Sequence, residues 1–523
     1  MNFKEYTKKS LILLVLLQPF LDIYFLYVPP VTNWVPFSPA TLIRIFLVAI
    51  IAGLYIWSSR HNKANRFAWL YMAILVIYLV LHLIFTRHFK STSPIDLGYS
   101  TVGEIFYWIR MVIPLVVLFV TTQIKVTRAE FNKVIKFLAW IISGSIVITN
   151  LFKISLSSYG GGWIQGNIFS WFGGGQQWAY YGLASKGFFY YANAVSAVEV
   201  LLTPMVLYYL VEKLDLKSIA LATVQMFAML MLGTKTASLG FFVVLAGYII
   251  LYLIYSLLFK EFKFKFSLFA TFAVLTLVGG AILPMSPMFN RTTTDTAVQK
   301  TQDGTKKEQK EKKKELEAEK EKEKEKEKEH KDDQIDHRKE TPLMRYIKNH
   351  YRDYSLNARF VMGGYSYRDD PQFWYQVMKW PVGDRLNYRK VEEAMLNRAK
   401  SVNNDSLNNW FGISYTRMNH IANLEQDFIS QWYSMGFIGV LLLIMPYVFV
   451  LLYCLYEVIR VLGKKATFFE VSLLFGSGLV IALSAFSGNV MDFLADTIIL
   501  AFALGYALVT TRGLKKHDGY RNS

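Results

Sequence analysis

Long runs of apolar residues recur along most of this chain, each close to twenty residues in length. A hydrocarbon core about 30 Å thick needs about 20 helical residues at a rise of about 1.5 Å each. Helices also satisfy their own backbone hydrogen bonds in lipid. The pattern therefore predicts an all-α polytopic membrane protein with about twelve transmembrane helices, near residues 10–28, 39–57, 67–86, 104–121, 133–152, 190–211, 216–233, 236–258, 266–286, 429–456, 467–486 and 490–511.

The predicted spans divide the chain into three parts. Helices 1–9 occupy residues 1–286, a large extracytoplasmic loop occupies 287–428, and helices 10–12 with a cytoplasmic tail occupy 429–523. Within the loop, residues 306–340 are almost entirely Lys and Glu, a composition that suits a solvated lone helix or a disordered segment. Residues 341–428 mix aromatic and polar side chains, which predicts a small subdomain of short helices.

Composition and charge support this architecture. The 523 residues are 53% hydrophobic and 16% aromatic, an unusual balance for a soluble protein. With a cytoplasmic N-terminus, the short inner connections contain 22 Lys and Arg residues and the short outer ones contain 5. This bias predicts a multi-pass plasma-membrane protein with both termini cytoplasmic and the large loop outside. The net charge of +18 thus reflects topology and gives no reason to expect nucleic acid as a partner. The single cysteine, Cys454, excludes an intramolecular disulfide.

Ionisable residues inside the predicted spans gather toward the outer side. Charge within a membrane is costly, so such residues indicate a pair, a path or a site. The set comprises Asp22, Arg44, His82, Arg110, Glu199, Asp492 and Asp496, with Lys235 at a turn between two helices. Any one of them is explained by a structural ion pair, such as Asp22 with Arg44. Because the set as a whole is one-sided, it favours a polar cavity open to the exterior.

An outward-facing cavity limits the chemistry. Nucleotides are absent outside the cytoplasm, and the chain has no G-x-x-x-x-G-K-[ST] phosphate-binding loop. An enzyme at this face would use an activated lipid already in the membrane, for which polyprenyl-diphosphate sugars are the obvious candidates. Their diphosphate needs cations, and the fork of an arginine suits it.

The outer connection 157–190 is rich in glycine, aromatic and glutamine residues. Trp178 and its aromatic neighbours are candidates to stack on sugar rings while the glutamines bind hydroxyl groups. An interfacial aromatic belt with flexible hinges explains the same composition equally well.

Several short motifs follow one another along the chain in a distinctive order. They are Gln-Pro-Phe-Leu-Asp at 18–22, Gly-Thr-Lys-Thr-Ala at 233–237, Asn-Ala-Arg at 357–359, Glu425-x-Asp427, and Gly436-x-x-Gly439, which is expected to open a helix. With the twelve-span plan and the outer loop after the ninth helix, this order resembles the O-antigen ligase and O-antigen polymerase superfamily in its Gram-positive form. The resemblance covers essentially the whole chain.

The resemblance implies a glycosyltransferase of surface polysaccharide biosynthesis that moves a saccharide from a polyprenyl-diphosphate carrier to an acceptor glycan or lipid. Two departures from the family pattern leave ligase and polymerase open. The place of the ligases' His-Asn pair is taken by Glu425-Gln426, with His420 five residues earlier, and the Lys/Glu-rich insert has no counterpart.

The expected roles follow from physical chemistry. Glu425 accepts the acceptor proton, Asp427 orients or binds the acceptor, and His420 is a secondary candidate. Arg359 neutralises the diphosphate with help from Lys235 and from Arg44 or Arg110, and Asp22 and Trp178 complete the candidate substrate-binding set. A purely structural explanation is also open for these residues: the two carboxylates would stabilise a helix N-terminus, and Arg359 would be a solvated surface cation.

The reaction is expected to be inverting and to need neither cofactor nor metal, because no convincing ligand set accompanies Glu425-x-Asp427 or Asp369-Asp370. Other polysaccharide-assembly proteins are further candidate partners. Two other classes remain open: a flippase or exporter of lipid-linked oligosaccharides, although no internal repeat is evident, and a non-catalytic protein of cell-envelope assembly.

Overall fold

A computed structural model describes residues 3–27, 38–59, 63–90, 97–172, 179–293, 340–486 and 488–516. Trp178 and the Lys/Glu-rich stretch up to residue 339 lie outside the described residues. The regular secondary structure of the described residues is helical, and their β-structure is limited to isolated β-bridges. Ten of its helices are long and apolar enough to cross a membrane. The all-α polytopic architecture predicted from the sequence is confirmed.

The long helices follow the predicted spans closely. They are α1 (Phe3–Leu21), α3 (Pro39–Ser59), α4 (Ala64–Arg87), α5 (Thr101–Gln123), α6 (Arg128–Leu151), α8 (Ala192–Glu212), α9 (Leu216–Leu232), α10 (Lys235–Leu253), α11 (Phe266–Ile282), α21 (Asp427–Gly439) continuing into α22 (Met445–Val461), α23 (Phe468–Phe486) and α24 (Leu494–Lys516).

The ends of the chain differ from the prediction. The first helix begins at Phe3 instead of residue 10, because its early charges are accommodated: Lys8 pairs with Glu130 of α6 at 2.9 Å and with Glu5 at 3.0 Å. The last helix begins at Leu494 instead of residue 490. Two helices fall outside the ten candidate spans, since α9 has only 17 residues and α1 carries four charges near its start. The count of twelve spans stays a prediction.

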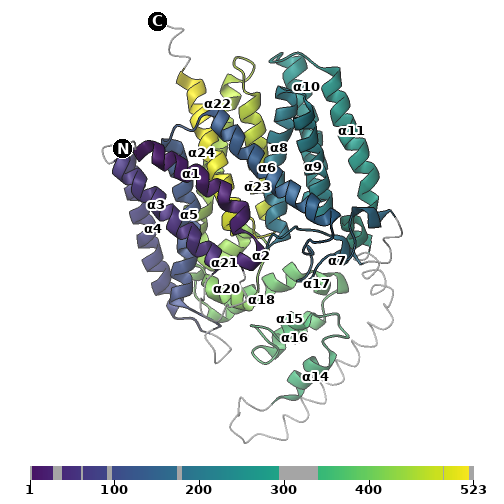
Figure 1. Ribbon diagram of the computed structural model, residues 1–523. Coiled ribbons are helices and arrows are strands. Elements are labelled where there is room, and N and C mark those ends of the chain that lie inside the picture. Colours follow the sequence, from purple (N-terminus) through teal and green to yellow (C-terminus); the bar gives the residue numbers. More distant parts are fainter. Residues whose placement is uncertain are drawn as a thin grey trace, which may run out of the picture.

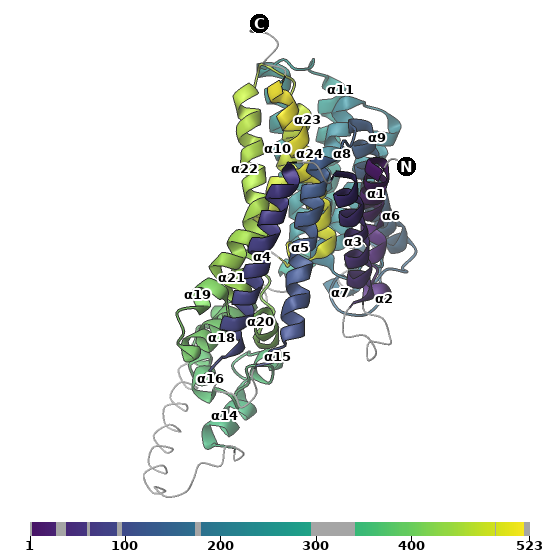
Figure 2. The ribbon, with the colours of Figure 1, turned by 90° about the vertical axis from the view of Figure 1, so that its left-hand side faces the viewer.

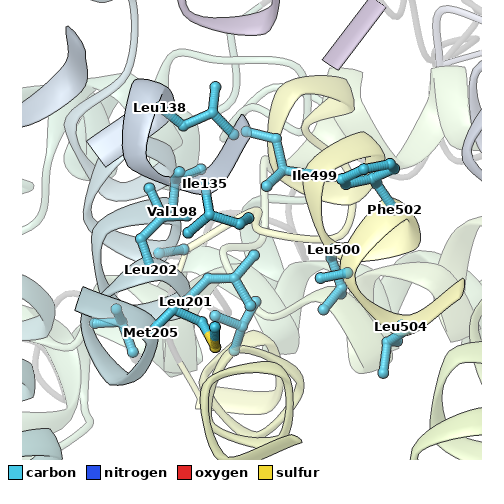
Figure 3. Close-up of a cluster of buried hydrophobic side chains, with 14 of the residues drawn as sticks. Ile135, Leu138, Val198, Leu201, Leu202, Met205, Ile499, Leu500, Phe502 and Leu504 are labelled. Atoms are coloured by element: carbon cyan, nitrogen blue, oxygen red, sulfur yellow. The ribbon is translucent and has the colours of Figure 1, made fainter. Parts of the chain in front are cut away.

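The centre of the bundle is formed by α8 and α24. In the most apolar 18-residue stretch of α8, 94% of the residues are buried, and in that of α24 the share is 89%. Side chains of α6, α8 and α24 interdigitate around Ile135, Val198 and Ile499 (Figure 3). Peripheral helices keep apolar faces exposed, as expected for helices that face lipid. In α4, for example, only 17% of the corresponding stretch is buried.

The long loop's C-terminal part forms short helices at one end of the bundle. They are α14 (Pro342–His350), α15 (Ala358–Val361), α16 (Pro371–Met378), α17 (Val382–Leu386), α18 (Tyr388–Asn403), α19 (Asn408–Phe411) and α20 (Tyr415–Ile421). Helices α14, α15, α16, α18 and α20 share a hydrophobic core of their own around Trp374, Val391 and Met395. Figures 1 and 2 show α14–α18 at the end of the molecule away from the start of α1 and the end of α24.

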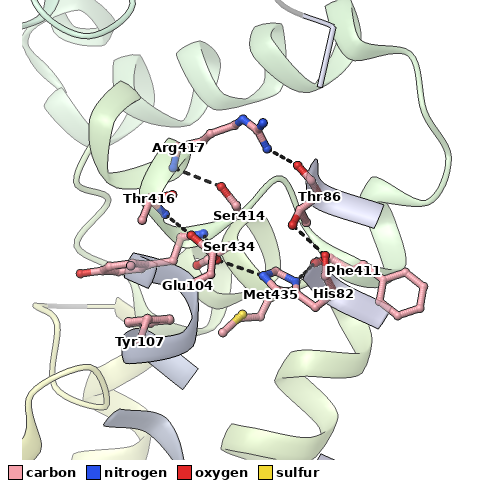
Figure 4. A network of polar contacts seen from close by, with 12 residues as sticks. His82, Thr86, Glu104, Tyr107, Phe411, Ser414, Thr416, Arg417, Ser434 and Met435 are labelled. Atoms are coloured by element: carbon pink, nitrogen blue, oxygen red, sulfur yellow. Dashed lines mark hydrogen bonds and ion pairs between the residues drawn. The ribbon is translucent and has the colours of Figure 1, made fainter. Parts of the chain in front are cut away.

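A buried ion pair docks these short helices onto α4 and α5 (Figure 4). Glu104 of α5 accepts hydrogen bonds from the backbone N–H groups of Tyr415 (3.0 Å) and Thr416 (2.7 Å), and it also pairs with His82 of α4 at 3.0 Å. The second ring nitrogen of His82 lies 2.7 Å from the carbonyl oxygen of Phe411.

Gly436 stands at a kink between two helical segments. The first segment of α21 begins at Asp427, Gly436 interrupts the helix with φ +70°, and a second segment begins after it and continues toward α22. A Cβ at this position would lie 2.3 Å from the backbone carbon of Trp410 in α19, and one at Gly439 would lie 2.5 Å from the hydroxyl of Tyr78. Both glycines therefore permit close packing, and only Gly436 also needs the left-handed conformation.

Candidate active site

Glu425 lies just before α21 and is held by two side chains from distant parts of the chain. The hydroxyl of Tyr191, the residue preceding α8, donates to Glu425 Oε1 at 2.6 Å, and Asn193 Nδ2 donates to that same hydroxyl at 3.2 Å. Burial and the neighbouring Glu425 raise the pKa of Tyr191, so the phenol keeps its proton. The side chain of Glu425 is 37% exposed and remains open to solvent.

Arg389, in the first turn of α18, is the second partner of Glu425. Its Nη2 lies 3.5 Å from Glu425 Oε2, and its Nη1 donates to the carbonyl oxygen of Phe486 at the end of α23 at 2.8 Å. The guanidinium thus links the loop helices to the membrane helices beside Glu425.

Glu392, one turn further along α18, brings Arg359 into the same neighbourhood. The side chain of Glu392 is only 5% exposed, and its Oε1 lies 3.7 Å from Arg359 Nη2. Burial raises the pKa of Glu392 to about 7; the nearby Glu425 adds to this effect, and Arg359 and Arg389 oppose it. Arg359 and Glu425 make no direct contact among the described residues, but both act on Glu392.

Asp427 is enclosed by backbone N–H groups of the segment before α24. Its carboxylate is 2% exposed and accepts hydrogen bonds from the backbone N–H groups of Val490, Met491 and Asp492 at 2.8, 3.0 and 3.2 Å. These bonds fasten the segment before α24 to the start of α21. The geometry favours positioning over direct contact with a substrate.

Two of the intramembrane arginines are held in ion pairs. Arg110 Nη2 donates to the carbonyl oxygen of Asp492 at 2.8 Å and lies 3.7 Å from its carboxylate. Arg44 pairs with Asp22 at 3.4 Å and donates to Gln18 Oε1 at 2.8 Å. The structural pairing of Asp22 with Arg44 considered from the sequence is present. Neither Arg44 nor Arg110 makes a polar contact with Glu425 in the described part of the chain.

The remaining candidates lie apart from Glu425. Lys235 is exposed at the start of α10. The ring of His420 is exposed and lies against Gly98 and Gly364, since a Cβ at either glycine would meet it at about 3 Å. Within the described residues, neither side chain has a hydrogen bond or ion pair to Glu425 or Arg359.

Three members of the cluster were not singled out from the sequence: Tyr191, Arg389 and Glu392. Helical spacing could have indicated Glu392. It lies on the same face of α18 as the buried residues Met395 and Ala399, so its burial follows from its position in the helix. Tyr191 and Arg389 carry no such signal. We define the cluster of Tyr191, Arg359, Arg389, Glu392 and Glu425 as the arginine–glutamate site.

The arginine–glutamate site can bind an anion and move a proton. Two guanidinium groups stand beside two carboxylates, one of which has a pKa near neutrality. No group of three or more His, Cys, Asp or Glu side chains suited to a metal ion occurs in the described ranges.

Fold and site together define a polytopic, all-helical membrane protein with a polar site where a helical loop region meets the bundle. A family model described as O-antigen ligase like membrane protein matches residues 4–513, and the chain belongs to this family. No curated protein matches the chain. The family gives the chain a membrane role in joining or polymerising polysaccharide, a glycosyltransferase-like activity and a lipid-linked glycan as substrate.

Proposed function

We propose that the arginine–glutamate site transfers an oligosaccharide from a polyprenyl-diphosphate carrier to an acceptor hydroxyl at the outer face of the plasma membrane. The Lys/Arg bias of the short connections supports this orientation, with both termini in the cytoplasm. The short helices α14–α20 would then lie outside, where nucleotide-activated sugars are absent and lipid-linked ones are present.

The observation that carries the proposal is the charge balance of the site. With Glu392 protonated, as its pKa of about 7 allows, the site keeps two guanidinium charges, on Arg359 and Arg389, and one carboxylate charge, on Glu425. The site then has a net charge of +1, which suits a diphosphate. The side chain of Arg359 is 60% exposed and so is accessible to a lipid-linked substrate that arrives from the membrane surface.

The proposed reaction is a single displacement. Glu425 takes the proton of the acceptor hydroxyl, and the acceptor oxygen bonds to the anomeric carbon as its bond to the diphosphate breaks. The diphosphate leaves with its negative charge next to Arg359 and Arg389. One displacement inverts the anomeric carbon, and the arginines provide the charge stabilisation without a metal. Asp427 positions the start of α21, next to Glu425, through its hydrogen bonds to the backbone before α24.

Arginine substitution tests the proposal. Arg359→Ala and Arg389→Ala should each lower glycan transfer at least about 100-fold, as loss of one group that stabilises transition-state charge typically does. Arg345→Ala, an exposed arginine on α14, is the matched control and should keep activity. The assay compares surface glycan length with the pool of lipid-linked repeats in cells expressing equal amounts of protein. Normal glycan in both variants would refute the proposed site.

The same assay separates the classes that the sequence left open. Accumulated single repeats indicate a polymerase, and long unattached lipid-linked chains indicate a ligase. Repeats retained on the cytoplasmic leaflet would instead indicate a flippase or exporter. Normal chemistry with misassembled envelope would indicate a non-catalytic assembly protein.

A further inference from the structure

Two short segments lie side by side next to Glu425. Residues 423–427 lead into α21, and residues 488–492 lead into α24. Gln426 and Gly488 form a parallel β-bridge, and the carboxylate of Asp427 accepts hydrogen bonds from the backbone of residues 490–492. A molecule that brings a hydroxyl group to Glu425 therefore meets side chains of both segments.

The side chains of Asn423 and Asn489 form an amide pair that joins the two segments. Asn489 Nδ2 donates to Asn423 Oδ1 at 3.2 Å. Asn423 is exposed and Asn489 is half-buried, whereas Leu424 and Val490, the next residue in each segment, are buried. The apolar neighbours anchor the two segments, and the amide pair lies at their surface.

Gly488 determines how close the segment of Asn489 comes to α8. It has φ +71°, a conformation that favours glycine, and a Cβ at this position would lie 3.1 Å from the Cβ of Asn193. Asn193 in turn donates to the hydroxyl of Tyr191 that binds Glu425. The turn at Gly488 thus holds the amide pair's segment against the residues that orient Glu425.

The amide pair keeps one donor and one acceptor for a ligand. Among the described residues, Asn423 Nδ2 and Asn489 Oδ1 have no other hydrogen bond. A sugar hydroxyl can both donate and accept, so two neighbouring hydroxyls of one ring can bond to such a pair. The pair is also neutral, in contrast to Arg359 and Arg389, which suit a diphosphate. Its chemistry therefore suits the acceptor better than the donor's leaving group.

We propose that Asn423 and Asn489 bind two neighbouring hydroxyl groups of the acceptor's terminal sugar and so bring its reacting hydroxyl to Glu425. This inference rests on the proposed function, since it assigns the second substrate of the same site. A displacement needs separate places for its two substrates, because the acceptor oxygen attacks the anomeric carbon opposite the leaving diphosphate. The arginines provide one place and the amide pair provides the other.

Transfer by the purified full-length enzyme in detergent tests the inference. The donor is radiolabelled lipid-linked repeat at a low fixed concentration, and the acceptor is supplied as solubilised envelopes from cells that lack the protein. Asn423→Ala and Asn489→Ala should each raise the amount of envelope needed for half-maximal incorporation about 3- to 10-fold, as loss of one neutral hydrogen bond typically does. With excess envelope, the donor concentration needed for half-maximal incorporation should keep its wild-type value.

A variant of nearly the same shape separates acceptor binding from a structural role. Asn423→Asp keeps the oxygen that accepts from Asn489 but lacks the amide donor, so its envelope requirement should rise as in Asn423→Ala. If the pair only holds the two segments together, Asn423→Asp keeps the wild-type requirement, and the inference is overturned. Asn349→Ala, which changes an exposed asparagine on α14, is the matched control and should behave as the wild type.

The outcome is distinguishable from a failure of the proposed function. Wild-type transfer in both Arg359→Ala and Arg389→Ala refutes the arginine–glutamate site itself. If the arginine variants lose transfer while Asn423→Ala and Asn489→Ala keep the wild-type envelope requirement, only the acceptor site is refuted. A raised donor requirement in the asparagine variants with an unchanged envelope requirement also overturns the acceptor assignment.

Discussion

Replacing Glu392 by Gln should make the protein more stable at neutral and alkaline pH. Glu392 is buried on α18 and has a pKa of about 7, well above the ordinary value of 4.5. The folded protein therefore holds this proton more tightly than the unfolded chain does. The native state has no penalty below about pH 4.5, loses stability as the pH rises from there to about 7, and carries the full penalty above it.

The magnitude follows from the two pKa values. The interval between 4.5 and about 7, at about 1.4 kcal/mol per pH unit, corresponds to about 3 kcal/mol. The side chain is 5% exposed, so solvent screening removes little of this amount. Gln has nearly the same shape and cannot ionise. At pH 8 the variant should gain up to about 3 kcal/mol relative to the wild type, and at pH 5 less than about 1 kcal/mol.

The assay is thermal unfolding of both proteins in detergent between pH 5 and 8. The Tm of Glu392→Gln minus that of the wild type should grow with pH and level off above about pH 7. The same change at Glu393, a half-buried neighbour on the same helix turn, controls for the removal of one carboxylate from α18. A Tm difference that is constant across this range, or that falls as the pH rises, would refute the reasoning.

Four further predictions follow from the site and its docking. The wild-type KM for the lipid-linked donor should rise above pH 7, as ionised Glu392 cancels the positive charge of the site, and this rise should be absent in Glu392→Gln. Tyr191→Phe removes the 2.6 Å hydrogen bond to Glu425 and should lower kcat about tenfold without altering Tm greatly, since one such bond to a charged group contributes about 1.5–3 kcal/mol. Glu104→Gln leaves the buried His82 without its carboxylate and should loosen the loop helices by about 3–5 kcal/mol, seen as faster proteolysis within residues 340–426; unchanged cleavage would contradict the docking role. Activity of the purified enzyme should survive a strong chelator, and its loss would show that a divalent metal takes part.

Much of the site could not be predicted because its members come from distant segments. The motif Glu425-x-Asp427 gives no reason to treat the two carboxylates differently. In the structure, Glu425 is partly exposed and has one cationic and one phenolic partner, whereas Asp427 is enclosed by three backbone N–H groups. Sequence spacing fixes which residues share a helix face, but it does not fix what lies opposite that face. Tyr191 and Glu425 are 234 positions apart and meet only through packing.

The sequence by itself determined the membrane architecture, because the length of an apolar helix and the cost of a charge in lipid are local properties that each segment reports independently. It also led to the prediction, through the family resemblance of the motifs around them, that Arg359 and Glu425 belong to one site. Only the tertiary structure decided that Glu392 pairs with Arg359 and Arg389 with Glu425. It also decided that Arg44 pairs with Asp22 and does not contact Glu425. Ion pairs of this kind depend on how α18 docks against the bundle, and that docking is set by many weak contacts between segments that no single stretch of sequence contains.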